Sequence, residues 1–121
     1  GVSQFFMGSV VSYHGDTKTN LLDVKQQTLQ EFGEVSCEVA EAMAVGAQKR
    51  LNVGWAGSIT GIAGPTGSQP DKPVGTVCFA VAGPNFVRSQ KVNFDKTLQR
   101  SEIQQASVEE LINILIDNFK N

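Results

Sequence analysis

Apolar residues follow two different spacings along this chain, one typical of strands and one typical of helices. Residues 5–14, FFMGSVVSYH, are aromatic and β-branched with partial alternation, and Gly15 and Asp16 follow them. Such a run, closed by a glycine and an aspartate, predicts a first strand that ends in a turn. Residues 17–22 come next and are long enough for about one helical turn.

Two further helices are predicted before residue 53. Residues 24–32 carry apolar side chains at helical spacing and end at Gly33, which favours a short helix with a glycine stop. Ser36 is a good N-cap for residues 37–52, which have an acidic first turn and a basic last turn. The apolar stripe of this second helix follows the 3.6-residue period and consists of Val39, Ala40, Met43, Ala47 and Leu51.

The second half of the chain predicts three strands and a long helix. Residues 55–60 form a short buried strand, and residues 75–83 and 85–94 form a hairpin through a Gly-Pro-Asn turn. A final helix is expected over residues 97–118, with a core face of Ile103, Val108, Leu111, Ile112, Leu115 and Phe119. Strands and helices in this mixture favour a mixed sheet flanked by helices, an α/β layered domain that takes up the whole chain, 1–121.

Composition and charge narrow the classes of function. The chain is 40% hydrophobic and 18% charged, with a net charge of −2 and no basic run, which disfavours nucleic acid and acidic membranes as partners. It has no apolar run of membrane-spanning length and no signal-peptide pattern, so a cytoplasmic protein is expected. Cys37 and Cys78 have neither CxxC spacing nor a cluster of histidines, so they read as reduced cysteines, and no metal site is expected.

The stretch TGIAGPTGSQPDKPVG, residues 60–75, holds four of the twelve glycines and three of the four prolines. Glycine permits positive φ and close approach of a ligand, whereas proline restricts the chain, so the mixture predicts a shaped loop. Its backbone N–H groups could bind phosphate or carboxylate, although it is not a phosphate-binding P-loop and a purely structural surface loop stays open. Tyr13 and Thr60, each at the end of a predicted strand, are expected to face one cleft.

Three stretches together resemble one family: residues 1–24, residues 28–48 (TLQEFGEVSCEVAEAMAVGAQ) and residues 58–83 (SITGIAGPTGSQPDKPVGTVCFAVAG). In this order and spacing they are similar to the C-terminal domain of the competence/damage-inducible protein CinA, a family that includes nicotinamide mononucleotide deamidase. The resemblance implies a three-layer α/β/α domain that hydrolyses nicotinamide mononucleotide to nicotinic acid mononucleotide and ammonia, in pyridine nucleotide salvage. It further implies a homo-oligomer and no cofactor.

Amide hydrolysis needs a nucleophile, a group that takes its proton, and donors for the developing oxyanion. The single histidine, His14, has no spacing that supports a Ser-His-Asp triad. The resemblance instead implies a set of Ser3, Tyr13 and Lys18, in which a lysine desolvated in a cleft holds a hydroxyl in its reactive state. On the residues alone, purely structural roles also remain open: Ser3 could cap a turn, Tyr13 could pack at a strand edge, and Lys18 could be a solvated helix residue.

The resemblance also implies a substrate-binding set for phosphate and ribose: Thr60, Gly61, Ala63, Gly64, Thr66, Gly67 and Arg100. Thr66 and Ser68 replace glycines of many members, which requires negative φ at both. Gln104 stands in place of a second family arginine, and Arg88 on the hairpin is an alternative phosphate partner.

Family domains carry an upstream helix and a strand ending in a Glu-Ser-Cys-Thr-Gly-Gly turn, which this sequence lacks. We therefore expect an unpartnered sheet edge that favours pairing with another chain, and two functions stay open. The chain is a nucleotide amidohydrolase or part of one, or it is a non-catalytic nucleotide-binding or oligomeric module; a plain scaffold is a weaker third. Lys18→Ala is expected to remove activity but keep the fold, and Gly64→Val to weaken binding far more than stability.

Overall fold

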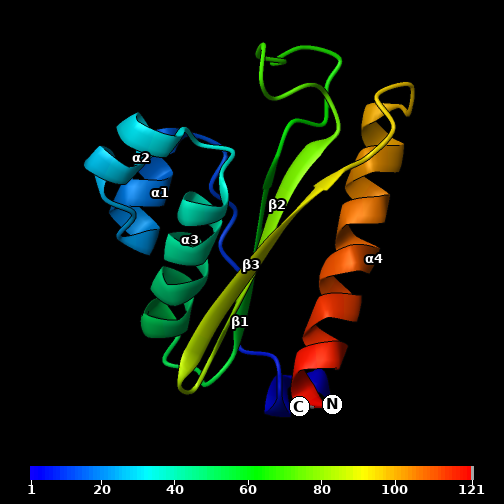
Figure 1. Cartoon of the computed structure of the whole chain (residues 1–121). Coiled ribbons are helices and arrows are strands. Elements are labelled where there is room, and N and C mark those ends of the chain that lie inside the picture. The colour runs from blue at the N-terminus through cyan, green and yellow to red at the C-terminus, as the bar shows by residue number, and fades with distance from the viewer. Residues whose placement is uncertain (121) are drawn as a thin grey trace.

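A computed structural model describes residues 1–120 and shows four α-helices around a small sheet (Figure 1). In chain order the elements are η1 (Val2–Gln4), α1 (Gly15–Leu22), α2 (Gln26–Phe32), α3 (Cys37–Arg50), β1 (Ala56–Gly61), β2 (Thr76–Gly83), β3 (Phe86–Asn93) and α4 (Arg100–Phe119). Both termini lie at one end of the sheet, and the long loop between β1 and β2 lies at the other (Figure 1).

The sheet has three strands in the order β1-β2-β3, and both pairings are antiparallel. The predicted mixed sheet is therefore wrong for residues 1–120, because no parallel neighbour joins these strands. The three layers are present: α3 packs on all three strands, with α1 and α2 against it, and α4 covers β1 and β2 from the opposite face. Most of the helical packing is thus on one face.

The central strand β2 is buried along its whole length and divides the core into two different halves. Toward α3 it presents small residues, Cys78, Ala80 and Ala82, which let Ala40 and Ala44 of the helix approach closely. Toward α4 it presents Val77 and Phe79, which pack against Ile103. Alternation of side chains along a strand produces this division, because successive residues point to opposite faces.

The sequence predicted α3 and the hairpin well. Ser36 caps α3: its Oγ accepts a hydrogen bond from Val39 N at 3.2 Å and donates one to Gly33 O at 2.9 Å. Of the predicted stripe, three residues are buried and two, Ala47 and Leu51, are half-buried. The hairpin joins β2 to β3 through a two-residue turn between Gly83 and Phe86.

Two predictions are wrong: the first strand, over residues 5–14, and the complete burial of the apolar face of the last helix. Residues 6–13 form no strand; the segment runs alongside the sheet toward α1 without a ladder partner (Figure 1). The apolar face of α4 is buried only in part: Ile103 is covered, but Val108, Ile112 and Phe119 are 51%, 51% and 58% exposed. The reason is geometric, since α4 is the sole α-helix on its face of the sheet within residues 1–120 and has no neighbouring α-helix to cover the rest of its stripe.

No helix in this part of the chain has the length and apolarity needed to cross a membrane.

Candidate functional site

A polar pocket of about 500 Å³ lies where β1 leaves the sheet. Its walls come from four parts of the chain: the segment entering α1, the turn before α3, the end of β1 with its loop, and the start of α4. Nine of the ten predicted site residues line it: Tyr13, Lys18, Thr60, Gly61, Ala63, Gly64, Thr66, Gly67 and Arg100. We call this depression the polar pocket.

Lys18 is the most deeply placed charged side chain of the polar pocket, with only 5% of its surface exposed. It extends from α1, and its Nζ donates a hydrogen bond to the carbonyl oxygen of Ser12 at 3.3 Å. A buried ammonium group needs hydrogen-bond partners, and one carbonyl satisfies only one of its three donors. Its remaining donors are therefore available to an acceptor that enters the pocket.

Tyr13 and His14 lie just before α1 and have different surroundings. Tyr13 lines the pocket, yet 85% of its side chain is exposed, so its ring borders the opening. His14 is the N-cap of α1, and its Nδ1 accepts a hydrogen bond from Asp16 N at 3.2 Å. His14 does not line the pocket, and a helix cap accounts for its position.

The start of the glycine-rich loop is held by hydrogen bonds to the body of the domain. Thr60 Oγ1 donates to the carbonyl oxygen of Glu34 at 2.8 Å, which ties β1 to the turn before α3. Ile62 N donates to Thr76 O at 2.9 Å and continues the pairing with β2. The loop therefore leaves the sheet in a fixed direction.

Gly64 and Gly67 have φ angles of +78° and +94°, the left-handed region in which side chains are strained, and the peptide bond between Gly64 and Pro65 is cis. Thr66 and Ser68 do not have positive φ, as the sequence required. A Cβ at Gly64 would also come within 2.6 Å of Val74 Cγ1. Gly64→Val is therefore expected to cost stability as well as binding, because the glycine is needed by the fold of the loop itself.

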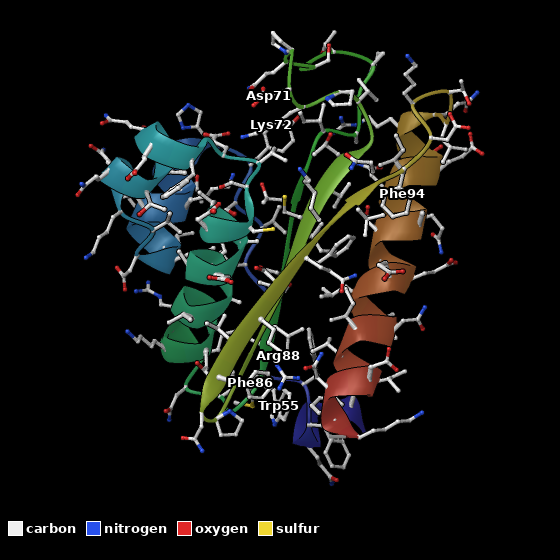
Figure 2. All side chains as sticks on the ribbon, in the orientation of Figure 1. Trp55, Asp71, Lys72, Phe86, Arg88 and Phe94 are labelled. Atoms are coloured by element: carbon white, nitrogen blue, oxygen red, sulfur yellow. The ribbon has the colours of Figure 1, made fainter. Side chains whose placement is uncertain are left out.

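The two candidate phosphate arginines lie at opposite ends of the molecule. Arg100, at the start of α4, lines the polar pocket, and its Nη1 donates to the carbonyl oxygen of Gly64 at 3.1 Å. Arg88 lies at the far end of the sheet, near Trp55 and over the ring of Phe86 at 4.7 Å (Figure 2). Only Arg100 can therefore serve a ligand in the pocket.

Ser3 is the one predicted site residue outside the polar pocket. It belongs to η1 at the end of the sheet that carries both termini, whereas the loop of the pocket lies at the other end (Figure 1). The structure does not bring Ser3 together with Tyr13 and Lys18. Gln104 also lies outside the pocket, on the exposed surface of α4.

Glu34 is a pocket residue that the sequence did not point to. It sits in the turn before α3, where no periodic pattern or motif marks it. Its carboxylate lies against Gly15, the first residue of α1, and a Cβ at that glycine would overlap it. With Lys18 and Arg100, Glu34 gives the pocket two positive groups and one negative group, an arrangement suited to a ligand that carries an anion and polar atoms. In the described part of the chain, no three metal-ligating side chains cluster.

Both cysteines are free thiols and lie next to the pocket, in the layer between α3 and β2. Cys78 pairs with Thr60 across the β1–β2 ladder. Burial, together with contact with the Cys37 thiol, raises the pKa of Cys78 to about 11. Cys78 is therefore a protonated core residue at neutral pH.

The comparisons with known proteins agree on one family. The model of the CinA C-terminal domain matches residues 1–119. CinA-like proteins of Prochlorococcus marinus and Nostoc punctiforme are 47% and 44% identical, over 95% and 99% of this chain. These matches cover only 27% and 28% of those two proteins, so the chain spans about a quarter of their length.

Solved structures of the family have the same fold. A competence/damage-inducible protein from Agrobacterium tumefaciens is 37% identical, with a TM-score of 0.84 over 88% of this chain and 64% of that one. A CinA superfamily protein from Escherichia coli is 29% identical, with a TM-score of 0.81 over 86% of this chain and 59% of that one. The chain belongs to the CinA C-terminal domain family.

Proposed function

We propose that the polar pocket binds nicotinamide mononucleotide and that the chain is the nucleotide-binding part of an amidohydrolase. The reaction joins water to the carboxamide and yields nicotinic acid mononucleotide and ammonia. One observation carries the proposal: a buried lysine, a glycine-rich loop and an arginine from three separate parts of the chain line one polar pocket. The homo-oligomer that the resemblance implies is likewise a proposal.

The two ends of the ligand would meet different groups. Arg100 uses one guanidinium N–H for Gly64 O, and its other donors remain for phosphate oxygens. Backbone N–H groups near Gly64 and Gly67, where φ is positive, add further donors for the anion. The carboxamide then lies toward Tyr13 and Lys18, on the opposite wall.

At the carboxamide end, Lys18 and Tyr13 are the groups that can move or hold a proton. The Lys18 ammonium, fixed by Ser12 O, can donate to the oxyanion that forms on the carboxamide, and the Tyr13 phenol can deliver a proton to the departing ammonia. Both roles require that the phosphate end is held first, because orientation of the amide against these groups supplies much of the rate.

A non-catalytic nucleotide-binding module is the second candidate. The placement of Ser3 favours it, because the hydroxyl that the resemblance assigns to catalysis lies away from the polar pocket. Such a module binds the nucleotide through the same loop and arginine but releases no ammonia. The two functions are thus separated by turnover and not by binding.

The test measures ammonia release and nucleotide binding on the same protein. Arg100→Ala is expected to weaken binding of the mononucleotide about ten- to a hundredfold, the range for loss of one charge-assisted contact, and to leave binding of the phosphate-free riboside unchanged. Arg88→Ala is the matched control, since this arginine lies at the far end of the sheet (Figure 2). Equal losses for both ligands, or no binding by the unaltered chain, would contradict the proposed site.

Lys18 is tested by Lys18→Met and not by alanine. Because Lys18 is buried, Lys18→Ala would leave a cavity and is no longer expected to leave the fold intact. Methionine keeps the unbranched stem while removing the charge. We expect at least about a hundredfold loss of ammonia release, with nucleotide binding retained. Binding without any ammonia release from the unaltered chain would favour the non-catalytic module.

A further inference from the structure

The two cysteines of the chain meet where α3 packs on β2. Cys37 is the first residue of α3, and Cys78 lies on β2, which this helix covers (Figure 1). Cys37 packs against the cluster of small side chains to which Cys78 belongs, and the two thiols are in contact. Segments that are distant in the sequence thus bring together both thiols of the chain.

Hydrogen bonds fix the start of α3 over the sheet on both sides of Cys37. Before it, the carbonyl oxygen of Glu34 accepts a hydrogen bond from Thr60 Oγ1 at 2.8 Å. After it, the carbonyl oxygen of Ala40 accepts a hydrogen bond from Ser58 Oγ at 2.5 Å. A single serine side chain on β1 therefore reaches the helix backbone, so α3 lies close to the strands at this point.

The register of the sheet places Cys78 beneath Cys37. In the β1–β2 ladder Thr60 is paired with Cys78 and Ser58 with Ala80, so the members of each pair share the face toward α3. Thr60 and Ser58 anchor the backbone on either side of the first residue of α3, which therefore lies over Cys78. A disulfide joins Cα atoms that are about 4.4–6.8 Å apart. Two cysteine side chains, one from each element, suit a separation that one serine side chain bridges next to them.

The two thiols differ in their access to solvent. Cys37 is half-buried, so a small oxidant can reach its sulfur. Cys78 is only 1% exposed, and burial raises its pKa to about 11, so its thiol is protonated at neutral pH. The thiolate is the form that attacks an oxidant. Cys37 is therefore the thiol that reacts first.

We propose that Cys37 is a site of reversible oxidation by hydrogen peroxide and that Cys78 converts the oxidised sulfur into an internal disulfide. In the first step the Cys37 thiolate attacks a peroxide oxygen: an S–O bond forms, the O–O bond breaks, and hydroxide leaves and takes up a proton to become water. In the second step the Cys78 sulfur attacks the Cys37 sulfur: the S–S bond forms, the S–O bond breaks, and the hydroxyl leaves as water with the Cys78 proton. Two thiols are oxidised and one peroxide is reduced, and two molecules of water are released.

Two other fates of the oxidised Cys37 fit the geometry less well. A disulfide between two copies of the chain needs a second molecule to arrive, whereas the Cys78 thiol is already in contact. Further oxidation to sulfinic acid needs a second peroxide before this neighbouring thiol reacts. The proposal does not rest on the proposed function, since neither cysteine lines the polar pocket and the product is read from the sulfur atoms alone.

The test treats the reduced, folded chain with hydrogen peroxide and then blocks the remaining thiols with N-ethylmaleimide in urea. Intact mass and peptide mapping should show that both thiols are lost together, in a monomer whose Cys37 and Cys78 peptides are joined. Dithiothreitol should restore both thiols. The same chain oxidised in urea is the control, and the disulfide should form there at least about tenfold more slowly, because the contact between the thiols is lost.

Variants separate the roles of the two cysteines. In Cys78→Ala no internal disulfide can form, and dimedone should trap a sulfenic acid at Cys37. In Cys37→Ser the buried Cys78 should stay unmodified under the same treatment. The matched control combines Cys37→Ala with Glu38→Cys, which keeps a thiol in the same helical turn but moves it to an exposed neighbouring position. Disulfide formation should be at least about tenfold slower in this control, because the moved thiol points away from Cys78.

Each of five results would overturn the proposal. They are a Cys37 that keeps its thiol in peroxide, a disulfide between two copies as the main product, oxidation of Cys37 beyond sulfenic acid while Cys78 stays free, equally fast closure in urea, and equally fast closure in the control with the moved cysteine. Should Cys78→Ala fail to fold, peptide mapping of the unaltered chain still decides the question.

Discussion

The polar pocket and the groove along the outer edge of β1, which residues 6–13 face from the other side, are both built on β1. Hydrogen bonds close the pocket, whereas the groove is lined by backbone that has no backbone partner within residues 1–120. At the pocket, Thr60 is tied to Glu34 and Arg100 to Gly64. Along the groove, Ile59 and the segment opposite it have no backbone partner in residues 1–120. Within residues 1–120, β1 thus has one edge paired with β2, which fixes the pocket, and one edge without a paired strand, which borders the groove.

This difference between the pocket and the groove indicates which contacts stabilise the folded domain. Antiparallel pairing of β1 with β2 holds the pocket end of the strand, and the two halves of the core hold β2 between α3 and α4. Large apolar side chains at the groove, including Phe5, Phe6 and Met7, are 61–85% exposed and contribute little burial. Substitutions on the two sides should therefore differ in effect.

The largest expected difference is between two phenylalanines. Phe79 is fully buried in the half of the core beneath α4, so Phe79→Ala should lower the free energy of unfolding by about 3–5 kcal/mol. Phe6 borders the groove and is 61% exposed, so Phe6→Ala should cost about 0.5 kcal/mol or less. Urea unfolding followed by circular dichroism measures both. Comparable losses would mean that the groove is filled in the free protein.

The next effect is a pH dependence of the free energy of unfolding, caused by Cys78 in the core beside the polar pocket. Burial raises the pKa of Cys78 from 9.0 to about 11, so in this interval the folded protein keeps a proton that the unfolded chain has lost. The stabilisation is therefore fully present below pH 9 and is lost as the pH rises toward 11, by about 2–3 kcal/mol. Unfolding measured at pH 8 and pH 11 should show this loss in the unaltered protein.

The control for this pH dependence is the variant Cys78→Ala, which has no ionisable side chain at position 78. Other groups titrate in the same interval, so the decisive quantity is the difference between the two proteins. The alkaline loss should be smaller in the variant by about the same 2–3 kcal/mol. An identical pH dependence would mean that water reaches Cys78 as readily in the folded state as in the unfolded state.

The elements around the polar pocket are also the ones that sequence patterns predicted. Helix α3 has a serine cap, charges that suit both ends and a periodic stripe, and its pattern and its packing agree. The hairpin has a turn signal between two apolar runs. The loop of the pocket was recognised because glycine and proline concentrate there, and its positive φ angles explain why.

An unpartnered sheet edge was expected, but the strand over residues 5–14 and the burial of the whole α4 stripe were predicted wrongly, for a physical reason. Residues 5–14 have a strand pattern, but a pattern reports the faces of a segment and says nothing of whether a neighbour exists to pair with it. The stripe of α4 was likewise real, but burial needs a second surface, and β1 and β2 cover only part of it. Glu34 and Ser3 show the same limit at the site, since both depend on how distant segments meet.

The smallest expected effect compares one side chain from each region. Thr60→Val keeps the shape of the side chain but removes the hydrogen bond to Glu34 O, so it should lower the free energy of unfolding by about 1 kcal/mol. Ser9, on the exposed side of the groove wall, is the control, and Ser9→Ala should change stability by less than about 0.5 kcal/mol. Both are measured by urea unfolding, with hydrogen exchange at Ile62 as a local readout. If β1 is fixed at the pocket by this bond, the Ile62 amide should exchange faster in Thr60→Val alone. Equal exchange in both variants would mean that pairing with β2 is enough to hold the loop, and that the pocket differs from the groove only in its pairing.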